Sequence, residues 1–175
     1  GQPYPEELEI TERFDHNLDV FFRPVKQTDE SLMKEFFYSL SDKSFYQRFF
    51  THQLAIPSST LQHMVNPDYD EEMGIIGLIK KDDRELMVAL GRYFLDRTSN
   101  MAEIAFIVRD SYQMLGIGSF LLRYLIDIAK SRGIKGFRGE VLKENQIMMH
   151  VLHQCGYPVQ SRLLDDCYTF SIIFK

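Results

Sequence analysis

This 175-residue chain has only two cysteines, no long hydrophobic run and no excess of positive charge. The two cysteines, Cys155 and Cys167, cannot build a disulfide framework and do not have the spacing of metal ligands. The longest uncharged apolar stretches, Met73–Ile79 and Ile104–Val108, are strand-sized and fall far short of the ~20 residues that a membrane span requires. We therefore expect a reduced, cytoplasmic protein with no metal site and no membrane association.

The charge balance argues against nucleic-acid binding. Twenty-five Asp and Glu residues outnumber twenty Lys and Arg residues, which gives a formal net charge of −5. Non-specific nucleic-acid binding normally needs a basic surface, so no nucleic-acid partner is expected. A local pocket for one small anion remains compatible with this balance. The chain begins at Gly1 without a basic and apolar leader, so we expect a trimmed protein or a piece of a longer chain.

A chain of this length is expected to form one domain. Residues 1–18 are polar, acidic and punctuated by prolines, which predicts a linker or arm, and residues 19–175 are predicted to form the domain. Apolar spacing predicts strands at 20–25, 74–79, 86–95, 101–108, 137–142, 159–163 and 167–174. It predicts helices at 30–40, 41–50, 57–64, 118–131 and 145–154. The mixed order indicates an α/β or α+β sheet protein rather than a helical bundle.

The most informative segment runs from Met101 to Ser119. It places a buried strand, a loop with glycines at 116 and 118, and the start of a helix in immediate succession. Glycines allow close backbone approach, and the unpaired N–H groups of a first helical turn attract anions. A pyrophosphate suits such a cradle. A tight strand-to-helix connection whose glycines serve packing is the alternative from these residues alone.

Two phosphate-binding loops of other folds do not match this segment. The chain has no Gly-x-x-x-x-Gly-Lys-Ser/Thr string, which excludes a P-loop. A dinucleotide-binding fingerprint needs a third glycine at the position that Leu121 occupies. The loop also follows several strands, whereas a Rossmann unit usually comes first in a chain.

A resemblance to the GNAT superfamily of N-acetyltransferases rests on two motifs. Motif A of that superfamily is similar to Gln113-x-x-Gly116-x-Gly118, and motif B is similar to Gly139-Glu140-Val141-x-x-Glu144-Asn145 with Cys155-Gly156-Tyr157 downstream. The resemblance covers residues 20–175. It implies the GNAT fold, a mixed and mostly antiparallel sheet of six to seven strands that is flanked by helices and splayed at the fourth strand.

A narrower resemblance, to the GNAT domain of protein-lysine acetyltransferases, rests on short strings. They are Pro3-Tyr4-Pro5, Phe22-Arg23-Pro24-Val25, Ser44-x-Tyr46-x-Arg48-Phe49-Phe50, Asp68-Tyr69-Asp70-x-Glu72-Met73 and Ala102-Glu103-Ile104-Ala105. In that subgroup the domain is often fused to an acyl-CoA-synthetase-like module and acetylates a lysine of acyl-CoA synthetases. The resemblance implies a protein substrate with an accessible lysine, such as an acyl-CoA synthetase, and a fused domain in a longer chain.

The resemblance also implies acetyl-CoA as co-substrate, with its pyrophosphate on the motif A loop. The loop residues implied to bind it are Gln113, Met114, Leu115, Gly116, Ile117, Gly118 and Ser119. The pantetheine arm would pair like an extra strand with the backbone of Phe106, Ile107 and Val108. The N–H of Val108 would then lie near the thioester oxygen, and Asn145 would either bind the pantetheine or stabilise the adjoining turn.

Glu103 is the predicted general base, because it is the only charged residue between Met101 and Val108. A carboxylate among such neighbours lies in a cleft, is paired, or has a raised pKa, and a raised pKa suits proton abstraction from an attacking amine. The alternative is a strand-end glutamate paired with Arg92 or a nearby lysine. The similarity of the Ala-Glu-Ile-Ala string to the acetyltransferase strand favours the base.

No general acid is predicted. Many GNAT enzymes have a tyrosine seven residues after the motif B asparagine, and Leu152 occupies that position here. Tyr157 is expected to close its helix by packing, and His150 and His153 are expected to be solvated. Coenzyme A is therefore expected to leave as the thiolate or to take its proton from water.

The sequence thus predicts an acetyl-CoA-dependent N-acetyltransferase in which the acceptor amine attacks the thioester directly. A protein lysine is the favoured acceptor, and the early aromatic residues Tyr46 and Phe50 are candidates for the wall of its pocket. Two alternatives remain open. One is a small-amine N-acetyltransferase, and the other is a non-catalytic acyl-CoA-sensing module that keeps the loop and does not need Glu103.

Overall fold

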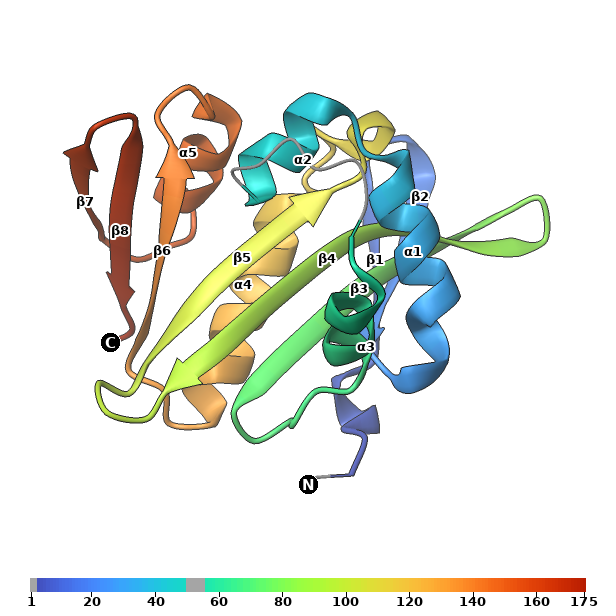
Figure 1. Ribbon diagram of the computed structural model, residues 1–175, viewed down its shortest axis with the longest axis horizontal. Helices are drawn as coiled ribbons and strands as arrows, with labels where there is room; N and C mark the ends of the chain where they lie inside the picture. The colour runs from blue at the N-terminus through green and yellow to red at the C-terminus, as the bar shows by residue number, and fades with distance from the viewer. Residues whose placement is uncertain (1–2, 50–55) are drawn as a thin grey trace.

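The computed structural model describes residues 3–49 and 56–175, and within them eight strands form one sheet in the order β1-β2-β3-β4-β5-β6-β8-β7 (Figure 1). The strands are β1 (Ile10–Phe14), β2 (Leu18–Pro24), β3 (Glu72–Lys81), β4 (Arg84–Asp96), β5 (Met101–Val108), β6 (Gly136–Leu142), β7 (Val159–Leu164) and β8 (Cys167–Ile173). The α-helices are α1 (Glu30–Ser39), α2 (Asp42–Phe49), α3 (Ser58–Val65), α4 (Ile117–Ser131) and α5 (Gln146–His153).

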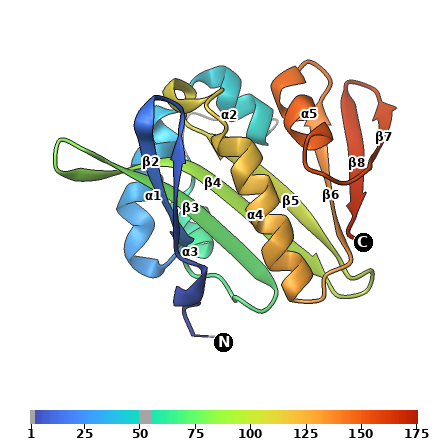
Figure 2. The same ribbon diagram turned by 180° about the vertical axis from the view of Figure 1, so that it is seen from behind.

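Helices cover both faces of the sheet. Helices α1, α2 and α3 lie on one face, and α4 and α5 lie on the other (Figures 1 and 2). The long helix α4 packs its apolar stripe, which includes Leu121 and Leu125, across β4 and β5. Gly91 of β4 makes this close packing possible, because a Cβ there would lie 2.6 Å from Leu125 Cδ1. The expected architecture, a mixed and mostly antiparallel sheet flanked by helices, is therefore confirmed.

The N-terminal segment differs from the expected arm. Ile10–Phe14, inside the segment 1–18 that we predicted to be a linker, pairs antiparallel with β2. The sheet therefore has eight strands rather than six or seven. The splay lies on the predicted strand 101–108, which becomes the fifth in the chain because β1 precedes it. The sequence does not reveal β1, because this edge strand is mostly exposed and carries no apolar run. Tyr4 also packs edge-on against Tyr69, which ties the segment to the domain.

The described residues also bear on three expectations from the sequence, which concern membrane spans, metal ligands and cysteine pairing. None of the described helices is long and apolar enough to cross a membrane. No cluster of three or more His, Cys, Asp or Glu side chains in residues 3–49 and 56–175 could hold a metal ion. Both cysteines are free: Cys155 is buried and Cys167 is half-buried. Phe50 lies outside the described residues.

A buried hydroxyl group gives a test of this packing. The Tyr93 hydroxyl on β4 is the one buried side-chain polar atom without a hydrogen-bond partner in the described part of the chain, and burial raises its pKa to about 12. Leaving such a group unsatisfied costs about 1–3 kcal/mol. We therefore expect Tyr93→Phe to raise the free energy of unfolding by about 1 kcal/mol in urea denaturation.

Tyr69→Phe is the matched control. The Tyr69 hydroxyl is buried and donates a hydrogen bond of 2.6 Å to the Val25 carbonyl. Its loss should lower the free energy of unfolding by about 1 kcal/mol. A Tyr93→Phe protein that loses as much stability as Tyr69→Phe would contradict the assignment of an unsatisfied hydroxyl.

Candidate functional site

The central feature of the site is the separation of β5 from β6. These two strands pair in parallel only at Met101–Glu103 with Gly136–Arg138, and they diverge beyond Glu103 (Figure 1). Gly139 stands where β6 turns away, and a Cβ there would lie 3.0 Å from the Ile104 carbonyl oxygen and 2.8 Å from the Phe170 ring. The divergence leaves residues 104–108 of β5 without a strand partner on one side.

The backbone register shows which β5 groups face this gap. The Arg109 N–H donates to the Val88 carbonyl of β4 at 2.7 Å, so Val108 and its partner Ala89 form a non-hydrogen-bonded pair. Because the pattern alternates along an antiparallel ladder, the N–H groups of Phe106 and Val108 point away from β4 and into the gap. The Val108 carbonyl on the same side accepts a hydrogen bond of 2.9 Å from the Gln113 side chain.

Ile107 requires a correction to the predicted backbone contacts. The same alternation directs its N–H and carbonyl toward β4, so they are part of the sheet ladder. Its side chain is 7% exposed and packs in the cluster beneath α1 and α3. Ile107 therefore borders the site through its side chain, while Phe106 and Val108 supply the free backbone donors.

The loop after β5 presents a second set of free donors. Met114 has a φ of 64° and Gly116, the N-cap of α4, has a φ of 98°. No backbone N–H from Met114 to Ser119 donates to an acceptor within the described residues. These amides, together with the positive end of the α4 dipole, form the cradle for an anion that the sequence predicted.

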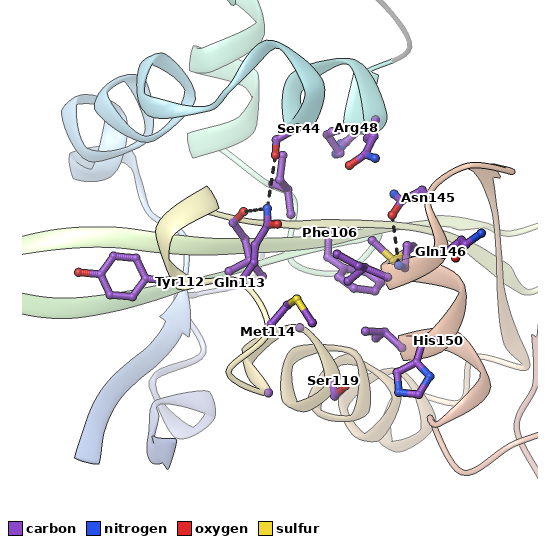
Figure 3. Close-up of a pocket in the computed structure, with 18 of the residues that line it drawn as sticks. Ser44, Arg48, Phe106, Tyr112, Gln113, Met114, Ser119, Asn145, Gln146 and His150 are labelled. Atoms are coloured by element: carbon purple, nitrogen blue, oxygen red, sulfur yellow. Dashed lines mark hydrogen bonds between the residues drawn. The ribbon is translucent and has the colours of Figure 1, made fainter. Parts of the chain in front are cut away.

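A cavity of about 500 Å³ connects the gap with the loop (Figure 3). Its lining includes nine of the predicted cofactor-binding residues: Phe106, Ile107, Val108, Gln113, Met114, Gly116, Gly118, Ser119 and Asn145. Leu115 and Ile117 do not line it, and Ile117 is buried against the sheet. The sequence did not point to the other lining residues, which are Ser44, Gln47, Arg48, Tyr112, Gln146, Ile147, Met148, His150, Val151 and Gln154.

Helix α2 is held over the cavity by a hydrogen-bonded bridge to the end of β5. Asp110 accepts hydrogen bonds from the Ser41 N–H and from the hydroxyls of Ser41 and Ser44. Burial acts to raise the pKa of Asp110, but these hydrogen bonds outweigh it and hold the pKa below its usual value. Gln113 also donates to the Ser44 hydroxyl at 3.3 Å. Sequence patterns could not reveal this bridge, because its partners lie more than sixty residues apart.

Asn145 performs one of the two roles left open for it. Its Oδ1 accepts a hydrogen bond of 3.2 Å from the Met148 N–H and so caps α5, while the residue itself is 9% exposed and borders the cavity. This shows that Asn145 stabilises the adjoining turn. Leu152 is fully buried, and His150 is exposed at the cavity rim (Figure 3).

Glu103 lies at the apex of the gap, as the last β5 residue paired with β6. It shares the α1–α3 face with Ala105 and Ile107, and its side chain is exposed rather than enclosed by apolar neighbours. The alternative pairing with Arg92 or a lysine is not seen, since Glu103 has no ion pair among the described residues. Glu103 does not line the cavity itself.

Comparison with known proteins agrees with this geometry. The Acetyltransferase (GNAT) family profile matches residues 25–157. An acetyltransferase of Pseudomonas aeruginosa is 27% identical over 155 residues, which are 89% of this chain and 83% of that protein. Acetyltransferase Pat of Mycolicibacterium smegmatis is 28% identical over 138 residues, which are 78% of this chain and 40% of Pat.

Solved structures give the same result. The GNAT domain of S. lividans PAT superposes with a TM-score of 0.89 at 25% identity, with 98% of this chain and 100% of that chain covered. Spermidine N-acetyltransferase from Vibrio cholerae, solved with CoA and spermine, shares the fold with a TM-score of 0.70 at 14% identity, over 88% and 95% of the two chains. The chain therefore belongs to the GNAT family of acetyltransferases and is an N-acetyltransferase.

Proposed function

We propose that this N-acetyltransferase transfers the acetyl group of acetyl-CoA to the side chain of a lysine in a protein acceptor. The observation that carries the proposal is the free edge of β5, where the Phe106 and Val108 N–H groups face a gap that continues into the amide cradle of Met114–Ser119. An extended pantetheine arm suits such an edge, since it can pair like a strand, and a diphosphate suits the cradle. The motif strings shared with protein-lysine acetyltransferases support a protein acceptor.

The residues at the gap have distinct roles in the proposed reaction. The acceptor amine attacks the thioester carbonyl carbon, a C–N bond forms, the C–S bond breaks, and coenzyme A leaves as the thiolate. The Val108 N–H donates a hydrogen bond to the oxyanion, an interaction worth about 10²–10³ in rate. Glu103 accepts the proton of the attacking amine. Glu103 lies five residues, about 17 Å of strand, before Val108, so a chain of water molecules carries the proton from the amine to Glu103.

The cradle can be tested by restricting its backbone. Gly116 has a φ of 98° and a Cβ there would meet only the Phe14 ring, at 3.6 Å, so Gly116→Ala adds strain without filling the cavity. The left-handed conformation costs an alanine about 1–2 kcal/mol, so the loop of the free variant relaxes away from it and binding has to restore it. We therefore expect coenzyme A to bind about five- to thirtyfold more weakly in calorimetry. Gly133→Ala is the control, because Gly133 also has a positive φ, of 78°, but lies at the far end of α4. Equal loss of affinity in both variants would contradict the proposed cradle.

The general base can be tested with an isosteric change. Glu103→Gln should lower turnover of acetyl-CoA with a lysine-bearing acceptor by about 10²–10⁴ and leave the dissociation constant of coenzyme A unchanged. Glu85→Gln, at an exposed carboxylate in the β3–β4 hairpin, is the matched control and should keep wild-type turnover. Full turnover by Glu103→Gln would remove Glu103 from the mechanism.

A further inference from the structure

Arg92 is a buried arginine without a counter-ion. Three arginines among the described residues are buried, and two of them are ion-paired: Arg23 with Asp29 and Arg109 with Glu35. Arg92, which is 9% exposed, has neither an ion pair nor a hydrogen bond among these residues, and its guanidinium stacks 4.6 Å over the Phe94 ring. Its guanidinium nitrogens are not fully buried, because the Tyr93 hydroxyl is the one fully buried side-chain polar atom without a partner in the described residues. A buried cation normally needs a partner, since desolvation of an unpaired charge is costly.

A second arginine without an ion pair among the described residues belongs to α2, which covers the same face of the sheet (Figure 1). Arg48 of α2 borders the cavity, its guanidinium packs 4.5 Å over the Phe49 ring, and no described carboxylate pairs with it (Figure 3). Burial, together with the positive charge of Arg92, lowers the pKa of Arg48 to about 10. The segment that follows, residues 50–55, contains no Asp or Glu in its sequence.

No carboxylate among the described residues forms an ion pair with Arg48 or Arg92. The charge of Glu72 on β3 acts on Arg92, but Glu72 lies 3.9 Å from His63 and is not within ion-pair distance of Arg92. Burial therefore still lowers the pKa of Arg92 below its usual range. Glu103 faces the same side of the sheet without pairing with either arginine.

The position of Arg48 and Arg92 favours a carboxylate of the acceptor, rather than the diphosphate of the cofactor, as the anion that they bind. Arg92 lies opposite Ala105 in the β4–β5 register, so it shares the face of the sheet that carries Glu103 and α2. The amide cradle for the diphosphate lies instead at the start of α4, which covers the opposite face (Figures 1 and 2). Two guanidinium groups repel an ammonium ion but attract a carboxylate, and arginine matches carboxylate geometry well.

We propose that Arg48 and Arg92 form a carboxylate-recognition site for the acceptor, which binds an Asp or Glu side chain close in sequence to the target lysine. This inference rests on the proposed function and adds a substrate class to it: lysines with an acidic neighbour. The same two charges also disfavour a polyamine acceptor. By lowering the pKa of an incoming amine, they favour the neutral form that attacks the thioester.

The test uses synthetic peptides in matched pairs, each with one lysine and with either Glu or Gln at one position within about four residues of it. Wild-type protein should acetylate the Glu member with a kcat/KM about tenfold higher, mainly through a lower KM. Arg48→Gln should reduce this ratio to about one, and Arg48→Glu should invert it in favour of the Gln member. Arg48 is half-buried on a helix surface, so these variants are expected to fold, which thermal unfolding checks.

Arg162→Gln, at an exposed arginine of β7, is the matched control and should keep the wild-type ratio. Coenzyme A titration separates the remaining outcomes. If Arg48→Gln weakens coenzyme A binding and leaves the peptide ratio unchanged, the arginine serves the cofactor and the inference is overturned. Equal acetylation of Glu and Gln peptides by wild-type protein overturns the inference and leaves the proposed function intact. Acetylation of free amino acids or polyamines, with no peptide or protein modified, overturns both.

Discussion

The end of the hydrogen-bonded pairing between β5 and β6 determines where the site of this protein lies. Strands β5 and β6 stop pairing after Glu103, which leaves the Phe106 and Val108 N–H groups in the middle of the sheet without partners among residues 3–49 and 56–175. Unpaired backbone groups inside a fold are costly, and an open strand edge on a surface invites aggregation. Here the edge lies inside the molecule, between α2 and α5, where an extended ligand can complete the ladder (Figure 3).

The two sides of the gap have different chemistry. On the α4 side, free amides and a helix dipole favour phosphate. On the α2 side lie the exposed carboxylate of Glu103 and two arginines, Arg48 and Arg92, that have no ion pair among the described residues. Because the amide cradle and these charged side chains lie on opposite faces of one sheet, the proposed donor and acceptor can approach the gap from different directions. The bridge from Asp110 to Ser41 and Ser44 connects the two sides, because it fixes α2 to the end of the strand that carries the free amides.

Sequence patterns predicted the elements well where burial was strong. The strand Met101–Val108 has the predicted bounds and α4 ends at Ser131 as predicted, since each combines apolar periodicity with a clear breaker. Strand β1 was missed, because an exposed edge strand has little apolar content and is stabilised by its neighbour. The exposure of Glu103 was also not predictable: a carboxylate in an apolar run suggests enclosure, and only the end of the β5–β6 ladder opens that position to solvent.

The sequence by itself determined the local chemistry: a strand, a glycine loop and a helix start that follow one another, with Asn145 as the next helix cap. Such features depend on residues close in the chain, so spacing and residue type are enough to predict them. Only the tertiary structure decided which backbone N–H groups stay free, that α2 borders the cavity, and that Arg92 lies on the face of the sheet that α2 covers. These facts depend on strand register and on packing between segments far apart in sequence, which local patterns do not encode.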